Sequence, residues 1–286
     1  MKLIRVLILV VFVPVYFQSS GQDIVVDAND KAIVEAILLD FKDADQSDPG
    51  KLLKEIALTF LETPYVAHTL ETGPDEKLVI NLRELDCTTY AENCLALVQT
   101  ILSDQPTFDT FKNKLERIRY RDGVRSGYLS RLHYFSEWID DNVNKGYVMD
   151  VARNIKAPEL TTVVGFMGDH PGSYPVLKAH PELVPELKRF EEKASDTKRW
   201  YIPIDNLDKY GQSIQDGDII GITTSVKGLD VTHVVIASRD KERLSFIHAS
   251  SAAEKVIRDP LTLKEYLTKG KSNTGIMVAR PVRSDR

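Results

Sequence analysis

Hydrophobic and polar residues follow two different patterns in the two halves of the chain. Apolar residues recur at helical spacing over residues 29–41 and 49–61, where Asp48 is a capping type and Pro49 suits a first turn. The second half has short β-type runs bounded by turn residues. These runs cover residues 200–204, 219–223, 231–237, 244–248 and 276–279, and a short helix over 261–267 precedes the last of them. Helices followed by antiparallel strands predict an α+β fold, not a parallel doubly wound sheet.

A third helix and a long loop are predicted between these regions. Leu95 and Leu97 continue with helical spacing after Asp86, which is a capping type. The pattern therefore places Cys87 in the first turn of this helix. Prolines and glycines are concentrated in residues 158–185, and this composition predicts a long loop over the surface.

The first 21 residues are typical of a secretory signal peptide. Lys2 and Arg5 form a basic start, residues 6–17 are apolar, and residues 19–21 are small. The apolar run has about 12 residues, whereas a helix that spans a bilayer needs about 20. We therefore expect export to the periplasm or the extracellular space without a stable membrane anchor. The mature chain, residues 22–286, is expected to be a single domain.

The composition suits a folded domain with a net negative charge. Of the 286 residues, 43% are hydrophobic and 28% are charged, which excludes disorder, collagen and coiled coil. The formal charge is −5, and loss of residues 1–21 would remove two basic residues and give −7. Binding to nucleic acid is therefore not expected. Residues 112–131 are locally basic, and they form either a solvated helix face or a wall that attracts a carboxylate-bearing ligand.

The two cysteines cannot form a disulfide with each other. Cys87 and Cys94 lie on one predicted helix with Cα atoms roughly 10 Å apart, whereas a disulfide needs about 7 Å or less. Cys94 lies mid-helix beside apolar residues and is expected to be a buried core residue. Cys87 lies where the helix dipole and unpaired N–H groups lower the pKa of a thiol, so a nucleophilic thiolate is predicted there.

Two histidines lie on adjacent predicted strands. If the hairpin turn is centred on Asp240 and Lys241, His233 and His248 lie directly opposite each other, with Cβ atoms about 5 Å apart. An odd-length turn would instead make them unrelated residues on opposite faces. Together with Cys87, the pair offers a nucleophile and a base. No paired metal-ligand spacing accompanies them, so no metal or organic cofactor is expected, and no Gly-x-Ser-x-Gly elbow supports a serine hydrolase.

Several segments resemble a known family of cysteine hydrolases. The matching segments, in chain order, are Thr63-Pro64-Tyr65, Leu85-Asp86-Cys87-Thr88-Thr89, Gly217-Asp218-Ile219-Ile220, Thr232-His233-Val234 and Ile247-His248-Ala249. They resemble the NlpC-type papain-like cell-wall hydrolases, with Thr88-Thr89 in place of Ser-Gly and with a long insert. The longer motifs 81–89 and 128–134 are similar to a branch of secreted bacterial enzymes. That branch is associated with N-acetylmuramoyl-L-alanine amidase activity on peptidoglycan fragments, notably anhydro-muropeptides.

This resemblance implies a fold, a reaction and a set of site residues. The implied fold is papain-like, with N-terminal helices packed on a central antiparallel sheet and a helical or loop insertion at roughly 103–200. The implied reaction is hydrolysis of the amide bond between N-acetylmuramic acid and L-Ala in a muropeptide, through a thioester and without a cofactor. By carry-over, Cys87 is the nucleophile, His233 the general base and His248 the orienting residue. The candidates for oxyanion and substrate binding are Tyr65, Asp86, Arg131, His133 and Tyr134, beside the N–H of Cys87.

Three other functions fit the same residues. The nearest is the same hydrolase acting inside the stem peptide, between D-Glu and the diamino acid. Another is a non-catalytic module that binds the cell wall, in which a Cys87→Ala substitution would leave function unchanged. The third is a papain-like acyltransferase, which would need an amine acceptor.

Overall fold

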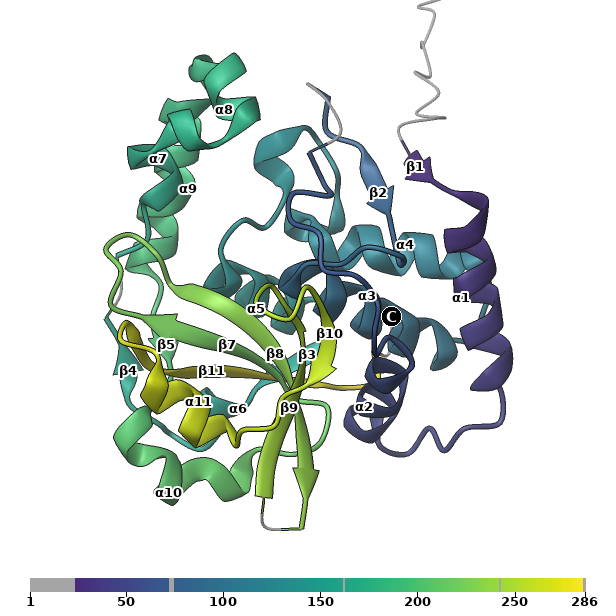
Figure 1. The fold of residues 1–286 in the computed structure, drawn as a ribbon. Coiled ribbons are helices and arrows are strands. Elements are labelled where there is room, and N and C mark those ends of the chain that lie inside the picture. Colours follow the sequence, from purple (N-terminus) through teal and green to yellow (C-terminus); the bar gives the residue numbers. More distant parts are fainter. Residues whose placement is uncertain (1–23, 72–74, 162, 242, 285–286) are drawn as a thin grey trace, which may run out of the picture.

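The fold is α+β, as the pattern predicts, in a computed structural model of the chain. The structure describes residues 24–71, 75–161, 163–241 and 243–284, so the predicted signal peptide lies outside the described residues. Within these ranges, no helix combines the length and the apolar character that crossing a membrane requires. Helices dominate the first part of the described chain, and long antiparallel strands follow them (Figure 1).

A seven-stranded sheet forms the centre of the fold. The order is β10-β9-β8-β7-β11-β3, with β6 also paired to β11, and all of these pairs are antiparallel. Its strands are β3 (Val148–Asp150), β6 (Ile202–Pro203), β7 (Ile219–Thr224), β8 (Val231–Asp240), β9 (Arg243–Ser250), β10 (Lys255–Arg258) and β11 (Asn273–Pro281). Two small sheets pair β1 (Ile24–Val26) with β2 (Leu78–Ile80) and β4 (Glu159–Leu160) with β5 (Arg199–Trp200). The last four predicted runs are confirmed as strands, whereas residues 200–204 are divided between β5, β6 and a 3-10 turn.

Both faces of the central sheet are covered, and successive side chains of a strand pack alternately on one face and the other. On β8, Val234 and Ile236 pack against the N-terminal helices, whereas Val235 and Ala237 pack on the opposite side. The first layer contains α1 (Ala28–Asp40), α2 (Pro49–Thr59), α3 (Cys87–Ile101), α4 (Phe108–Arg119) and α5 (Phe135–Asn144), with η1 (Arg121–Gly123) and η2 (Tyr128–Ser130) between the last two. The second layer contains α6 (Val151–Asn154), η5 (Ile204–Asn206), α10 (Leu207–Tyr210), η6 (Gly211–Ser213) and α11 (Leu263–Lys269).

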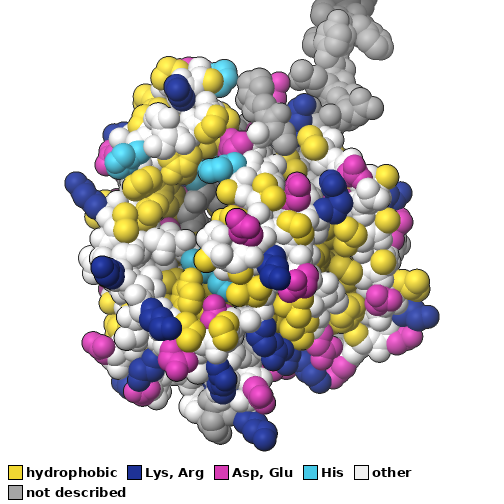
Figure 2. Space-filling view, in the orientation of Figure 1, with side chains coloured by type: hydrophobic (Ala, Val, Ile, Leu, Met, Phe, Trp, Pro, Cys, Tyr) yellow, Lys and Arg dark blue, Asp and Glu magenta, His cyan; other side chains and the backbone are white. Residues whose placement is uncertain are grey.

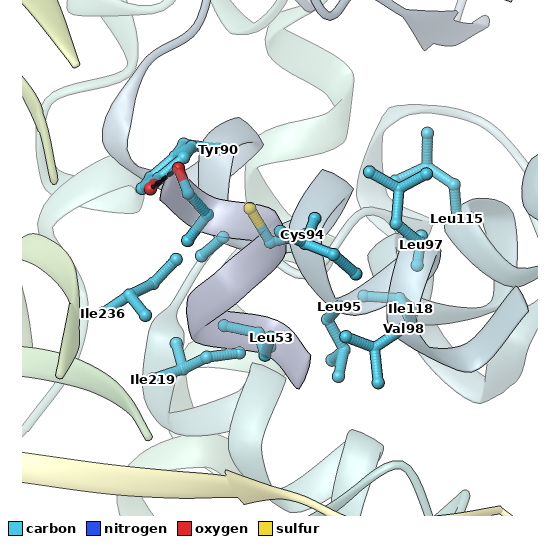
Figure 3. Close-up of a cluster of buried hydrophobic side chains, with 14 of the residues drawn as sticks. Leu53, Tyr90, Cys94, Leu95, Leu97, Val98, Leu115, Ile118, Ile219 and Ile236 are labelled. Atoms are coloured by element: carbon cyan, nitrogen blue, oxygen red, sulfur yellow. Dashed lines mark hydrogen bonds between the residues drawn. The ribbon is translucent and has the colours of Figure 1, made fainter. Parts of the chain in front are cut away.

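Helix α3 is buried along almost its whole length. Every residue from Thr89 to Ile101 is buried, so the helix has a fixed position in the core. Cys94 is fully buried in one cluster with Leu53 of α2 and Ile236 of β8, which confirms its predicted core role (Figure 3). Its thiol is not in a disulfide. Because the body of α3 is held on all sides, its first residue is held as well.

The turn before β7 gives the Gly-Asp motif a structural explanation. Gly217 has φ of +75°, and a Cβ at this position would lie 1.8 Å from the carbonyl oxygen of Gly50 on α2. Only glycine fits at such a close approach. Asp218 is fully buried and accepts two hydrogen bonds of 2.8 Å from the guanidinium of Arg280 on β11. The motif therefore joins α2, β7 and β11.

The region predicted to be a long loop is helical, so that prediction is wrong. Residues 163–197, which we call the arm, stand at one end of the molecule (Figure 1). Their apolar side chains form a small core together with Tyr128, Leu129 and Tyr134 of the main body. The arm contains α7 (Phe166–Asp169), η3 (Pro171–Ser173), α8 (Pro175–Ala179), η4 (Pro181–Leu183) and α9 (Val184–Asp196). Prolines such as Pro175 and Pro181 occupy first turns of these short helices, where their missing N–H costs nothing.

The basic stretch of residues 112–131 does not form a wall of free cations. Arg119 is buried and ion-paired with Glu92 of α3 at 2.7 Å. The other ion pairs among the described residues include Lys112 with Asp109, Arg121 with Glu137, Arg125 with Glu116, and Arg131 with Glu71 and Glu76. These arginines are compensated within the protein, and the expectation of an anion-attracting wall fails for them.

Candidate active site

Cys87 is the first residue of α3, as the sequence predicts. The carboxylate of Asp86 caps the helix by accepting hydrogen bonds from the N–H groups of Thr88 and Thr89, at 3.0 and 2.7 Å. The hydroxyl of Thr89 accepts from the N–H of Asp86 and completes a capping box. The cap therefore uses the N–H groups of Thr88 and Thr89. The N–H of Cys87 is left to interact with the sulfur of the same residue.

The sulfur of Cys87 lies against β8, at a point where the sheet opens. β8 pairs with β9 only from Ile236 to Asp240. In the earlier part of β8, the N–H of Val234 lies near enough to the sulfur of Cys87 to oppose the rise in the pKa of this thiol. His233 directly precedes Val234, and it lines the same cleft as Cys87.

His233 and His248 are in direct contact, although the register differs from the predicted one. The hairpin pairs Asp240 with Arg243, so the turn lies one position later than its predicted centre. In this register His233 is diagonal to His248 instead of opposite, and the even-length turn still puts both on one face. The Nε2 atom of His233 lies 2.6 Å from the Nδ1 atom of His248, and the ring centroids are 5.0 Å apart.

A carboxylate extends this contact on the far side of His248. Asp259 follows β10, and its Oδ2 atom lies 3.3 Å from the Nε2 atom of His248, at ion-pair distance but outside hydrogen-bond geometry. Such contacts often tighten only when substrate binds. The other oxygen of Asp259 accepts the N–H of Leu261 at 2.8 Å. Sequence reasoning missed Asp259, because β10 is only four residues long and carries no recognisable strand pattern.

Cys87 and His233 both favour their neutral forms. Burial raises the pKa of Cys87 to about 11, the Asp86 carboxylate adds to the rise, and the N–H of Val234 opposes it. Burial lowers the pKa of His233 to about 4, and burial together with His233 lowers the pKa of His248 to about 3. The predicted lowering of the thiol pKa is therefore wrong, since desolvation outweighs the helix dipole. At neutral pH the site holds a thiol and an imidazole.

Cys87 and His233 line a cleft that is also lined by the arm. Figure 2 shows the molecule hollowed between the arm and the main body, with histidine side chains at the rim. Aromatic rings with polar tips make up much of the lining, and these suit ligands with both apolar faces and hydroxyl groups. The larger apolar and aromatic residues of the cleft are Tyr128, Tyr134, Phe135, Trp138, Met167 and Tyr174.

Arg131 lines this cleft with its charge already compensated. Its Nη2 atom donates a hydrogen bond to Glu71 at 2.6 Å, and its Nε atom lies 3.6 Å from the carboxylate of Glu76. Its guanidinium lies over the ring of Tyr128, 4.9 Å from the centroid. The side chain is only 6% exposed. A ligand carboxylate would have to displace these partners, so the contacts of Arg131 favour a role in holding the cleft wall.

His133 and Tyr134 also line the cleft, with their polar atoms engaged inside the protein. The Nε2 atom of His133 lies 2.9 Å from the carbonyl oxygen of Tyr128, and burial lowers the pKa of His133 to about 3. The hydroxyl of Tyr134 donates to Glu191 at 2.7 Å and accepts from the N–H of Met167 at 3.0 Å. The structure thus brings Arg131, His133 and Tyr134 to the cleft, and the last of these also joins the main body to the arm. The other two predicted residues, Tyr65 and Asp86, do not line this cleft.

Two tyrosines lie close to the catalytic candidates. Burial raises the pKa of Tyr65, and the charge of an ionised Cys87 adds to the rise, so this hydroxyl is within electrostatic reach of the thiol. Burial, Asp259 and Cys87 raise the pKa of Tyr266 on α11 in the same way. The ring of Tyr266 meets that of His248 edge-on, with centroids 5.9 Å apart. Sequence reasoning missed Tyr266, because a short helical pattern does not indicate which strand it covers.

The arrangement suits nucleophilic catalysis. A base beside a nucleophile, held by a further group, is the arrangement that activates a thiol or hydroxyl. Because His233 uses its Nε2 atom for His248, its Nδ1 atom is the one that can face Cys87. In the part of the chain that the structure describes, no three histidine, cysteine or carboxylate side chains gather in a way that could hold a metal ion.

Comparisons with known proteins identify the family of the chain. Residues 55–276 match the AmiA-like family, described as N-acetylmuramoyl-L-alanine amidase-like. An N-acetylmuramoyl-L-alanine amidase from Bacteroides uniformis is 38% identical with a TM-score of 0.79, over 82% of this chain and 99% of that one. A Bacteroides fragilis protein described as a proposed xylanase is 40% identical with a TM-score of 0.75, over 79% and 99%.

Two further comparisons say nothing about activity: one shows a shared fold, and the other found no match. A Legionella pneumophila protein shares the fold at 20% identity, with a TM-score of 0.63 over 89% of this chain and 99% of that one. No curated protein matched the sequence. Since the family match spans most of the sequence, the chain belongs to the AmiA-like family of N-acetylmuramoyl-L-alanine amidase-like proteins.

Proposed function

We propose that the protein is a cysteine amidase that hydrolyses the bond between N-acetylmuramic acid, in its anhydro form, and L-Ala in peptidoglycan fragments. The observation that carries this proposal is that Cys87 and His233 line one cleft and that His233 contacts His248 at 2.6 Å. The AmiA-like family and the amidase from Bacteroides uniformis support the substrate class. The Cys-His-His set and the α+β fold support membership of the NlpC-type papain-like superfamily.

We also propose that the enzyme is bacterial and exported. The basic start and the apolar run of residues 6–17 support a signal peptide, which would direct the chain out of the cytoplasm. The mature enzyme acts as a single hydrolase domain, with the region of roughly 103–200 as an insertion that supplies part of the cleft.

The first half of the reaction forms a thioester. As the sulfur of Cys87 attacks the amide carbonyl, the thiol proton passes to the Nδ1 atom of His233, so no thiolate is required beforehand. The oxyanion is stabilised by the N–H of Cys87, with the hydroxyl of Tyr65 as a second donor. One such donor is worth roughly 10²–10³ in turnover.

Collapse of this tetrahedral adduct completes the thioester and releases the amine, and hydrolysis then releases the acid. His233 returns the proton to the amide nitrogen as the C–N bond breaks, and the peptide leaves with a free amino group. Water then attacks the thioester, gives one proton to His233 and releases the muramic acid as a carboxylic acid. The proton returns to the sulfur, which restores the starting thiol.

A glycosidase activity, as in the description of one structural relative, has less support. It needs two carboxyl groups about 5–9.5 Å apart across the bond to be cleaved. The carboxyl groups that line the cleft are Glu71 and Asp230. Glu71 is ion-paired with Arg131. Asp230 accepts the N–H groups of Ser136 and Val231 and so holds the wall of the cleft.

The proposal is tested by digesting a defined anhydro-muramoyl peptide with the wild type and with Cys87→Ala and His233→Ala. Wild type should release a peptide that begins with free L-Ala, as identified by mass spectrometry. Each variant should lose activity by at least about 10³-fold, because each removes a member of one catalytic unit. His180→Ala is the matched control, since His180 is an exposed histidine of the arm that pairs with Glu182.

Each other outcome points to one of the alternatives. A muramoyl dipeptide as product would identify an endopeptidase that cuts between D-Glu and the diamino acid. Turnover that requires an added amine would identify an acyltransferase. If both variants match wild type, the cysteine mechanism is wrong, and a wall-binding module becomes the better account.

A further inference from the structure

A second cleft adjoins the one that Cys87 lines. Thr232 and His233 line both clefts, whereas Cys87 lines only the first. The second cleft is bordered by α11 and by the segments that follow β10 and α11, including Tyr266 and Lys269. The two clefts therefore meet at the proposed general base.

The chemistry of amide hydrolysis assigns one end of the substrate to each cleft. The acyl carbon becomes bonded to the sulfur of Cys87, while the amide nitrogen must receive its proton from His233. The acyl part therefore lies on the thiol side, and the departing amine lies beside the imidazole. In the proposed substrate the acyl part is the muramic acid, and the amine belongs to the peptide. The peptide therefore extends towards the second cleft.

The charges of the two clefts agree with this direction. In the first cleft Arg131 is compensated by Glu71, and aromatic rings with polar tips suit an uncharged sugar. In the second cleft Lys269 is exposed, and its ammonium makes no hydrogen bond or ion pair with the described residues. Its one carboxylate neighbour on α11 is Glu265, four residues earlier, whose pKa it helps to lower from a distance. The carboxylate of that cleft, Asp259, is held at ion-pair distance from His248. A peptide carries at least one carboxylate, which an unpaired ammonium attracts.

We propose that the second cleft is the peptide subsite of the enzyme, in which Lys269 binds a carboxylate of the stem peptide. Tyr266 lines the same cleft, with its ring centroid 6.5 Å from that of His233. The inference rests on the proposed amidase function, which names the acyl and amine halves of the substrate. It makes Lys269 a specificity-determining residue that touches the peptide and not the sugar.

The test compares two anhydro-muramoyl tripeptides, one with free carboxylates and one with every carboxyl group amidated. Lys269→Ala should lower kcat/KM roughly fivefold on the free carboxylates, through KM, because a hydrogen bond to a charged group is lost. On the amidated substrate its effect should be less than about twofold, and Lys269→Arg should restore the preference. Lys264→Ala is the control, since Lys264 lies on the same helix, pairs with Asp208 and lines a different cleft.

Two results would overturn the subsite. One is an equal loss on both substrates with Lys269→Ala, and the other is no loss on either. Failure of the proposed function is a different result, because wild type would then cleave neither substrate or give another product. Calorimetric titration of the free tripeptide into wild type and Lys269→Ala tests the subsite without turnover. Binding that is unchanged by Lys269→Ala would also exclude it.

Discussion

At the scale of single residues, three side chains in series, His233, His248 and Asp259, determine which ring nitrogens carry hydrogen. For the Nδ1 atom of His233 to accept the thiol proton, its hydrogen must be on Nε2, which donates to the Nδ1 atom of His248 at 2.6 Å. His248 then carries its hydrogen on Nε2, which faces the carboxylate of Asp259 at 3.3 Å. On the proposed mechanism, Asp259 is a positioning residue that fixes the tautomers of both imidazoles.

Replacing the carboxylate with an amide tests this role. Asp259→Asn keeps an oxygen for the N–H of Leu261 but can turn a donor towards His248, which favours the wrong tautomer. We expect kcat to fall by about tenfold to a hundredfold with KM nearly unchanged, because the loss concerns proton transfer and not binding. Steady-state kinetics on the anhydro-muramoyl tripeptide, with pH profiles of kcat, measure both effects.

Asp240→Asn serves as the control for the loss of a negative charge, because Asp240 lies at the turn between β8 and β9, away from the two histidines. A fall in melting temperature without a change in kcat would show that Asp259 is only structural. A loss confined to KM would assign it to the peptide subsite instead.

Among single residues, local patterns predict positions better than they predict ionisation. The capping residue Asp86 and the helical periodicity after it place Cys87 correctly at a helix start. The pKa of its thiol depends on how closely β8 covers it, and no local pattern contains that distance. Asp259 is missed for the same reason, since its contact with His248 depends on the pairing of β9 with β10.

At the scale of elements, a buried carboxylate is among the contacts that join the arm to the main body, beside the backbone hydrogen bonds from Gly165 and Phe166 to Gly228. Glu191 on α9 accepts hydrogen bonds from the hydroxyl of Tyr134 at 2.7 Å and from the N–H of Gly168 on α7 at 2.9 Å. It is buried. A Cβ on Gly168 would lie 2.3 Å from the other oxygen of Glu191, so α7 and α9 meet closely at this point.

Glu191→Ala should loosen the arm without unfolding the rest of the protein. The substitution leaves a buried hydroxyl and a buried N–H without an acceptor, at a cost of about 1–3 kcal/mol for each group. Because the arm contributes Met167 and Tyr174 to the cleft, KM for the muropeptide should rise several-fold while kcat changes little. Limited proteolysis should cut the arm of the variant faster than that of wild type.

Glu192→Ala, at the exposed neighbouring position, is the matched control. Faster proteolysis with an unchanged KM would mean that the arm does not take part in binding. Unchanged proteolysis would mean that the arm is held by its apolar contacts instead of by Glu191.

Elements with caps or long periodic runs are predictable from the sequence, whereas short packed elements are not. Asp48 with Pro49 correctly marks the start of α2, and the apolar runs give β7 and β8. The arm is mistaken for a loop because its helices are short and depend on tertiary contacts, and its prolines begin helices as readily as they end them.

At the scale of the whole molecule, burial shifts acidic and basic groups in opposite directions. Burial raises the pKa of Glu76, Glu92 and Asp230. These carboxyls bind protons more readily in the folded state, so their contribution favours folding in acid and is lost as the pH rises through their folded pKa. Burial lowers the pKa of His133 to about 3, and this contribution has the opposite sign. The net dependence on pH is therefore a balance, and one group must be isolated by substitution.

His133→Asn isolates the largest imidazole shift outside the catalytic pair. Below about pH 6.5 the unfolded chain binds a proton at His133 that the folded chain, with a pKa of about 3, does not. Stability is therefore lost as the pH falls from about 6.5 towards 3. In wild type this single group should cost on the order of 2 kcal/mol between about pH 7 and pH 5, and less if water reaches the ring. Urea unfolding of both proteins at each pH gives the free energies.

The variant should be less stable than wild type near pH 7, because the ring of His133 packs 4.5 Å from that of Tyr128. Its stability should nevertheless fall less between pH 7 and pH 5, since asparagine does not titrate. The difference between the two pH dependences removes the contributions of the carboxyls that both proteins share. Parallel curves for the two proteins would show that His133 titrates normally in the folded state, and that the nearby Arg131 and the cleft wall leave it accessible to water.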